Sequence, residues 1–104
     1  MHFLQLTAAI KARAREERVT SCASVFDAVF SLMTIANLDS GPESEAVSRI
    51  LVGAAGIATV MDYRADDLEA LTPDSVRYLD CLLEALADGR CDSRLLYDLL
   101  RPGL

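Results

Sequence analysis

The sequence predicts an all-α protein, a small helical bundle of four main helices plus a short C-terminal helix. Apolar residues recur every three or four positions in almost every segment, which is the spacing of one helix face. Alanine, leucine, glutamate and arginine, all good helix formers, dominate these segments. Glycine and proline, which interrupt helices, number only five and three among 104 residues. A chain of this length has room for one core, so we expect a single helical domain over residues 1–104.

The first expected helix runs from Phe3 to Arg18. Its apolar residues are spaced as one stripe that would face the core, namely Phe3, Leu6, Ile10 and Ala14. The basic residues of "KARAREER" lie toward its C-terminal end, where the helix dipole favours positive charge. This position gives the cations a structural role, and a binding patch is the alternative.

A second helix is expected to begin at Thr20 or Ser21, either of which can cap it, and to end at Leu38. The segment "TSCASVFDAVFSLMTIANL" carries a single charged side chain, that of Asp27. Its apolar side chains surround most of the helix circumference. A helix that is apolar nearly all round must be covered on more than one side, so this helix is expected to contact more than one neighbour.

The third expected helix, from Pro42 to Tyr63, is predicted to be the central apolar helix of the bundle. Proline suits a position in the first turn, and Ser40 with Glu43 matches a capping box. The stretch "LVGAAGIATVM" belongs to an uncharged run of twelve residues. Because a membrane-spanning helix needs about 20 such residues, we expect this run to be buried in protein, with no contact to a membrane.

Small residues, including Gly53 and Gly56, leave little side-chain bulk in the middle of this third helix. Glycine inside a helix costs about 1 kcal/mol relative to alanine, which is tolerable where a neighbour must come close. We expect Phe26 or Phe30 of the second helix to pack there, with the two helices forming an antiparallel hairpin. The alternative is that the same small face crosses its symmetry mate in a dimer.

An acidic connection follows, with one helical turn over residues 66–71 and with carboxylates that we expect to be solvated. Thr72 then caps a fourth helix, with Pro73 in its first turn and Gly89 just past its end. Charged residues oppose the apolar face of this helix. A short fifth helix is expected at 92–100.

The charge balance and the few reactive side chains exclude several classes of function. The net charge is −6, which disfavours binding to nucleic acid. His2 is the only histidine, and no nucleotide-binding or zinc motif is present, so we expect neither an enzyme nor a cofactor or metal site. Three cysteines, Cys22, Cys81 and Cys91, form no C-x-x-C pair and indicate a reducing cytoplasm.

We therefore predict a small cytoplasmic regulator without enzymatic activity, which forms a homodimer and binds or masks another protein such as a transcription factor. Apolar residues make up 52% of the chain and charged residues only 25%, an excess that suits a subunit interface. The residues expected at the partner or dimer interface are Val25, Phe26, Val29, Phe30, Met33, Gly53, Gly56 and Ile57.

Two alternatives belong to other classes. In a DNA-binding regulator, "KARAREER" would be a basic arm and the junction of the second and third helices a helix-turn-helix, but neither helix begins with side chains suited to reading bases. In a ligand-binding bundle, a pocket would be lined by Phe30, Met33, Ile57 and Met61.

Overall fold

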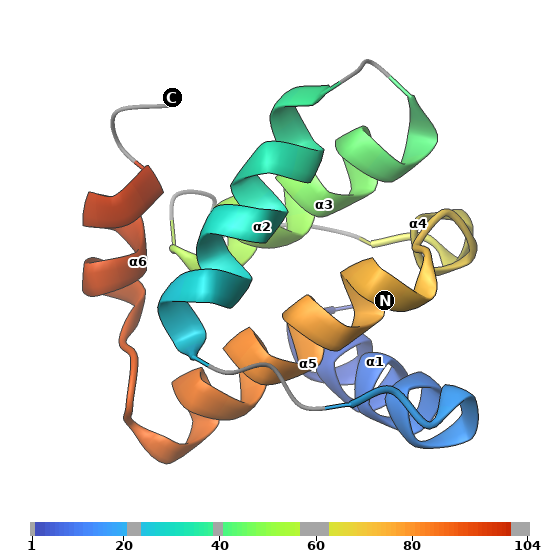
Figure 1. The fold of residues 1–104 in the computed structure, drawn as a ribbon, viewed down its shortest axis with the longest axis horizontal. Helices are drawn as coiled ribbons and strands as arrows, with labels where there is room; N and C mark the ends of the chain where they lie inside the picture. The colour runs from blue at the N-terminus through green and yellow to red at the C-terminus, as the bar shows by residue number, and fades with distance from the viewer. Residues whose placement is uncertain (1, 21–23, 39–40, 57–62, 101–104) are drawn as a thin grey trace.

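The structure of the protein is a computed structural model that describes residues 2–20, 24–38, 41–56 and 63–100 (Figure 1). Within these residues the chain forms six α-helices and no strand, which confirms the predicted all-α class. The helices are α1 (Phe3–Glu17), α2 (Val25–Leu38), α3 (Pro42–Ala54), α4 (Ala65–Glu69), α5 (Pro73–Asp88) and α6 (Ser93–Leu100).

Helix α2 begins later than the sequence predicts. Its first residue, Val25, follows Ser24, whose hydroxyl accepts a hydrogen bond from the backbone N–H of Asp27 at 3.1 Å. Thr20 precedes the helix, and Ser21 lies outside the described residues. A serine in this position satisfies one of the N–H groups that the first turn leaves unpaired. Ser24 is therefore the residue that caps α2.

Helix α3 ends at Ala54, so the prediction of a helix that continues to Tyr63 is wrong. Gly56 has a φ of 72°, in the left-handed region, and its N–H donates to the carbonyl of Gly53 at 3.1 Å. This is the conformation in which a glycine commonly ends a helix. Gly56 thus stops α3 instead of packing inside it. Residues 57–62, which include Ile57, lie outside the described part of the chain.

The packing of the helices centres on α2 and α5, which share the most extensive contact between any two helices of the described residues (Figure 1). Helix α5 also packs against α1, and α2 also packs against α3. Helix α3 has α2 and α4 as its main neighbours. The central position expected for the third helix therefore belongs to the α2–α5 pair, although α3 contributes Val47, Ile50 and Leu51 to the core.

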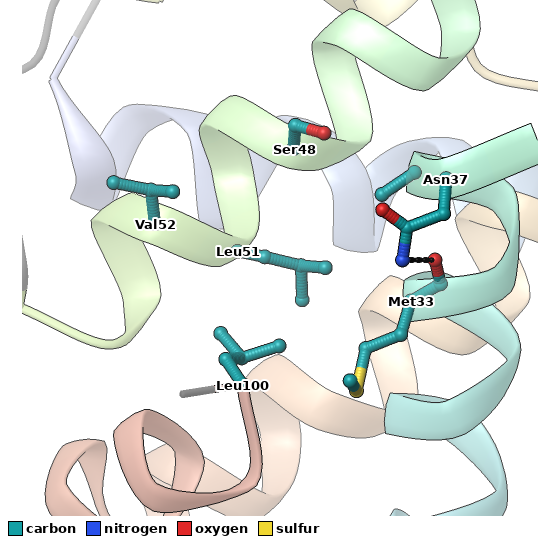
Figure 2. A pocket seen from close by; sticks show the side chains of 7 residues that line it. Met33, Asn37, Ser48, Leu51, Val52 and Leu100 are labelled. Carbon is teal, nitrogen blue, oxygen red and sulfur yellow. Dashed lines mark hydrogen bonds between the residues drawn. The ribbon is translucent and has the colours of Figure 1, made fainter. Parts of the chain in front are cut away.

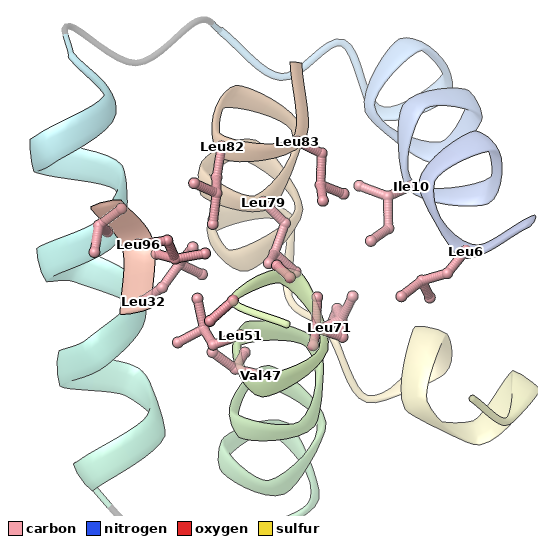
Figure 3. Close-up of a cluster of buried hydrophobic side chains, with 14 of the residues drawn as sticks. Leu6, Ile10, Leu32, Val47, Leu51, Leu71, Leu79, Leu82, Leu83 and Leu96 are labelled. Atoms are coloured by element: carbon pink, nitrogen blue, oxygen red, sulfur yellow. The ribbon is translucent and has the colours of Figure 1, made fainter. Parts of the chain in front are cut away.

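The buried side chains form one cluster with α5 in its middle (Figure 3). Leu83 of α5 points toward Ile10 of α1, while Leu82 points toward Leu32 of α2. All four are almost completely buried. Fully burying a side chain of this size contributes about 1.5–3 kcal/mol, so α5 connects α1 to the rest of the bundle through apolar contacts.

A carboxylate of α3 fixes the first turn of α5. Glu43 accepts hydrogen bonds from the backbone N–H of Thr72 at 2.8 Å and from the hydroxyl of Ser75 at 3.1 Å. Partial burial alone would raise the pKa of Glu43, but these hydrogen bonds hold the pKa below its usual value. Glu43 therefore stabilises the first turn of α5. The sequence predicts instead that Glu43 completes a capping box with Ser40, a residue outside the described part of the chain.

Two charged side chains fix α4 in place. The guanidinium of Arg13 in α1 donates to the backbone carbonyls of Leu68 and Leu71, at the end of α4. Arg49 of α3 forms a 3.0 Å ion pair with Asp67, which also accepts from the N–H of Arg64. Asp67 is only 5% exposed. The expectation that the carboxylates of this connection are all solvated is therefore wrong at Asp67.

Candidate interaction surface

The outer side of α2 carries two large aromatic side chains that are about half exposed. Phe26 is 51% exposed and Phe30 is 55% exposed, although both are fully apolar. The two residues lie one helical turn apart, so their rings project from the same side of α2. Val29 and Leu32, on the inner side of the same helix, are completely buried.

A small apolar groove continues this surface toward the C-terminal end of α2 (Figure 2). Its volume is about 100 Å³, and it lies between α2, α3 and the last residue of α6. The side chains of Met33, Leu51 and Leu100 point toward one another across it. The residues that line the groove are Met33, Ala36, Asn37, Ser48, Leu51, Val52 and Leu100. A shallower depression lined by Phe30, Met33, Thr34 and Asn37 joins the groove to the exposed ring of Phe30.

We refer to Phe26, Phe30, Met33, Thr34 and Asn37 together as the α2 face. Its polar side chains already have partners within the helix. Thr34 donates from its hydroxyl to the carbonyl of Phe30 at 2.9 Å. Asn37 donates from Nδ2 to the carbonyl of Met33, also at 2.9 Å (Figure 2). A polar group that keeps such a hydrogen bond costs less to remove from water. The α2 face can therefore be covered by another protein at a small desolvation cost.

The predicted interface residues on α2 separate into two groups. Phe26 and Phe30 are exposed, whereas Val29 is completely buried and belongs to the core. Val25 and Met33 are partly buried and pack against the core. Because the exposed rings keep about half of their surface in water, the expected burial of Phe26 or Phe30 against the glycine side of the third helix is wrong.

The described structure places none of the predicted interface residues beyond α2 on the α2 face. Gly53 is partly buried within α3, and Gly56 lies exposed just after that helix, with open space around the position of a Cβ. Ile57 is outside the described residues, as is Met61 of the predicted ligand pocket. The structure therefore brings Phe26, Phe30 and Met33 together on one surface, and it places neither glycine on the α2 face.

Sequence reasoning missed several residues of the surface. Asn37 could have been found, because it continues the spacing of Phe26, Phe30 and Met33 by four residues. Val52 and Leu100 carry no such signal, because their contribution depends on how α3 and α6 pack beside α2. A tertiary arrangement of this kind is not encoded in local spacing.

A second pocket, of about 130 Å³, is polar and lies between α5 and the segment after α1. Burial and the neighbouring carboxylate of Glu84 raise the pKa of Asp80, while Lys11 and Arg15 act in the opposite direction. The lining residues are Val19, Thr20, Arg77, Asp80, Cys81, Glu84 and Arg90. Two arginines and two carboxylates give this pocket no net charge that would favour an anion or a cation.

The described cysteines show little sign of reactivity. Cys81 is partly buried in the polar pocket, and Cys91 is buried. Burial raises the pKa of the Cys91 thiol, and the adjacent Asp92 adds to this effect. A raised pKa keeps a thiol protonated and weakly nucleophilic. Cys22 lies outside the described residues.

Two of the four basic residues of "KARAREER" contact other helices. Arg13 donates to the backbone carbonyls of Leu68 and Leu71 at the end of α4, and Lys11 lies 3.7 Å from the carboxylate of Glu84, whereas Arg15 and Arg18 are exposed. The first turn of α3, which a helix-turn-helix would place near DNA, carries Glu43 and Glu45. Both features weigh against the DNA-binding alternative, because a phosphate backbone attracts free cations and repels carboxylates.

The described helices are all too short or too polar to cross a membrane. Among the same residues, histidine, cysteine and acidic side chains form no group of three or more that could hold a metal ion. Comparison with protein-family models, with curated proteins and with solved structures gives no match.

Proposed function

We propose that this protein is a small cytoplasmic regulator without enzymatic activity, which acts by binding or masking another protein and assembles as a homodimer. The observation that carries this proposal is the exposure of Phe26 and Phe30, each about half uncovered, beside the apolar groove. Completely burying a phenylalanine side chain contributes about 1.5–3 kcal/mol. Covering both rings would therefore contribute appreciably to binding.

The shape of this surface favours a protein partner over a small ligand. The groove, at about 100 Å³, is well below the roughly 300–1,000 Å³ that is usual for small-molecule pockets, and the adjoining depression, at about 450 Å³, is too shallow to enclose most of a small molecule as such pockets do. A groove of this size suits one or two side chains that project from another protein. Aromatic residues and methionine, which are enriched at the centres of protein interfaces, supply most of the α2 face.

Binding to another protein can be tested with two charge-introducing variants. Phe30→Glu places a carboxylate in the middle of the α2 face, and Leu4→Glu places one on α1, where Leu4 is 75% exposed. In affinity capture from a cell extract, the wild-type protein and Leu4→Glu are expected to bind the same partner protein. Phe30→Glu is expected not to bind it. The interaction is then reconstituted from purified components, and its dissociation constant is measured by calorimetry.

The proposal fails if all three proteins retain the same set of partners, or if purified partner and wild-type protein do not bind each other. Circular dichroism of each variant establishes that the fold is unchanged. Since Leu4→Glu alters the net charge by the same amount as Phe30→Glu, it separates an effect of the α2 face from an effect of charge on solubility.

A further inference from the structure

The residues of the α2 face repeat with a regular spacing. Phe26, Phe30, Met33 and Asn37 are separated by four, three and four positions. This is the alternation of the d and a positions of a heptad, the pattern with which one helix packs along another. Each of the four contributes to the exposed rings, to the groove or to the depression between them.

We propose that the α2 face binds the α2 face of a second copy of this chain, with the two helices antiparallel, an arrangement that specifies the dimer of the proposed function and rests on that function. The aromatic rings project from the N-terminal half of α2, and the groove lies beside its C-terminal half. A symmetric dimer requires each copy to offer both halves of the contact. Antiparallel helices satisfy this requirement, because the rings of each copy then meet the groove of the other.

The positions of ring and groove fix the register of the two helices. The two-fold axis passes between positions 31 and 32 of α2, midway along the stripe that Phe26 and Asn37 delimit. Phe30 then lies opposite Met33 of the partner subunit, and Phe26 lies opposite Asn37 of the partner subunit. By symmetry the partner's Phe30 lies opposite Met33 and the partner's Phe26 lies opposite Asn37, on the side of the groove. The same contact is therefore made twice.

Charge distinguishes the two possible orientations of the second copy. Each copy has a net charge of −6, so two copies repel each other at long range, and an uncharged contact surface avoids adding to this repulsion. The α2 face has no ionisable side chain, and Asp27 is the only charged residue of α2. In antiparallel helices the two Asp27 residues are nine positions apart, or about 13 Å at 1.5 Å per residue. Parallel helices in register would place them side by side.

The length of the stripe predicts a weak dimer. The four positions extend over about 16 Å of helix at 1.5 Å per residue. A contact of this length buries less surface than the roughly 1,600 Å² of a standard stable interface. We therefore expect a dissociation constant in the micromolar range, typical of assemblies that exchange with their subunits. This range leaves the monomer available to bind a different protein through the same face.

A pair of complementary charges tests both the contact and its orientation. Phe30→Glu and Met33→Lys are each expected to weaken the dimer about tenfold or more in sedimentation equilibrium. An equimolar mixture of the two is expected to form a heterodimer, with a dissociation constant much closer to that of the wild type. In the antiparallel register Glu at position 30 faces Lys at position 33 of the other copy, whereas parallel helices would not pair them. Leu4→Glu is the control that leaves the dimer unchanged.

Three results would overturn this assembly. They are a wild-type protein that stays monomeric up to millimolar concentration, a dimer that Phe30→Glu does not weaken, and single variants that the mixture does not rescue. Each result leaves the binding of another protein intact if Phe30→Glu still abolishes the capture described above. Conversely, a rescued heterodimer without any captured partner supports the dimer and contradicts the masking of another protein.

Discussion

Helices α5 and α2 are both rich in leucine, valine and other apolar residues, but they bury them differently. Leu79, Leu82 and Leu83 of α5 lie on one side and are buried, and the charged residues of that helix lie elsewhere on its surface. Helix α2 is apolar on both sides, with Val29 buried and Phe30 exposed. The comparison teaches that a similar apolar composition can give a helix with one buried apolar side, as in α5, or a helix with a second apolar side that stays exposed, as in α2.

The largest expected effect separates the two sides of α2 itself. Val29→Glu is expected to lower the free energy of unfolding by about 3–5 kcal/mol, because it places an unpaired carboxylate in the core. Phe30→Glu places the same carboxylate in solvent and is expected to change the free energy of unfolding by about 1 kcal/mol or less. Urea unfolding, followed by circular dichroism at a concentration where the protein is monomeric, measures both. Equal losses of unfolding free energy in the two variants would mean that both sides of α2 are equally buried.

The second prediction compares α5 with the outer side of α2. Leu79→Ala is expected to cost about 2–5 kcal/mol, since it leaves a cavity where a completely buried side chain was. Phe26→Ala removes a larger side chain but creates no cavity, so we expect a loss below about 1 kcal/mol. Both values come from the same urea titrations. A loss at Phe26 as large as that at Leu79 would contradict the exposure of the α2 face.

The same two helices show how far the sequence predicts this fold. Gly89 predicts the end of α5 and Thr72 predicts its start, because capping residues act through their immediate neighbours. The apolar residues of α5 all lie on one side and so predict its buried face. In α2 the pattern shows no such division, so the sequence predicts that Val29 and Phe30 lie together at an interface. Only the positions of α3, α5 and α6 decide which of them is covered.

The end of α3 was missed for a different reason. A glycine in a helical pattern can be an interior residue or the residue that stops the helix, and Gly53 and Gly56 illustrate both. Local spacing does not distinguish them, because the choice depends on where the chain must turn. Leu100 was likewise assigned to a short helix without any indication that it closes the groove beside α2.

Gly89 provides a smaller test of the same distinction at the end of α5. Its φ is 84°, and a Cβ added there would meet nothing within 4 Å. Gly89→Ala is therefore expected to cost about 1–2 kcal/mol from backbone conformation alone. Thermal unfolding by circular dichroism measures the loss. An unfolding temperature that does not fall in Gly89→Ala would contradict this account.

The smallest effect concerns the first turn of α5, which α3 fixes through Glu43. Glu43→Gln is expected to lower the free energy of unfolding by about 0.5–1 kcal/mol at pH 7, because the carboxylate accepts hydrogen bonds from Thr72 and Ser75. The folded-state pKa of Glu43 is lowered from its ordinary 4.5. Its contribution is therefore complete above pH 4.5 and disappears as the pH falls through the lowered value.

The pH dependence distinguishes this carboxylate from a merely polar side chain. We expect the difference between wild type and Glu43→Gln to shrink steadily below pH 4.5, as measured by urea unfolding at several pH values. Glu69→Gln, on the exposed side of α4, is the control for replacing a carboxylate by an amide. A difference that persists unchanged at pH 3 would mean that the neutral acid caps α5 equally well. The first turn of α5 would then depend on hydrogen bonding alone, without the charge that the helix dipole favours at this end.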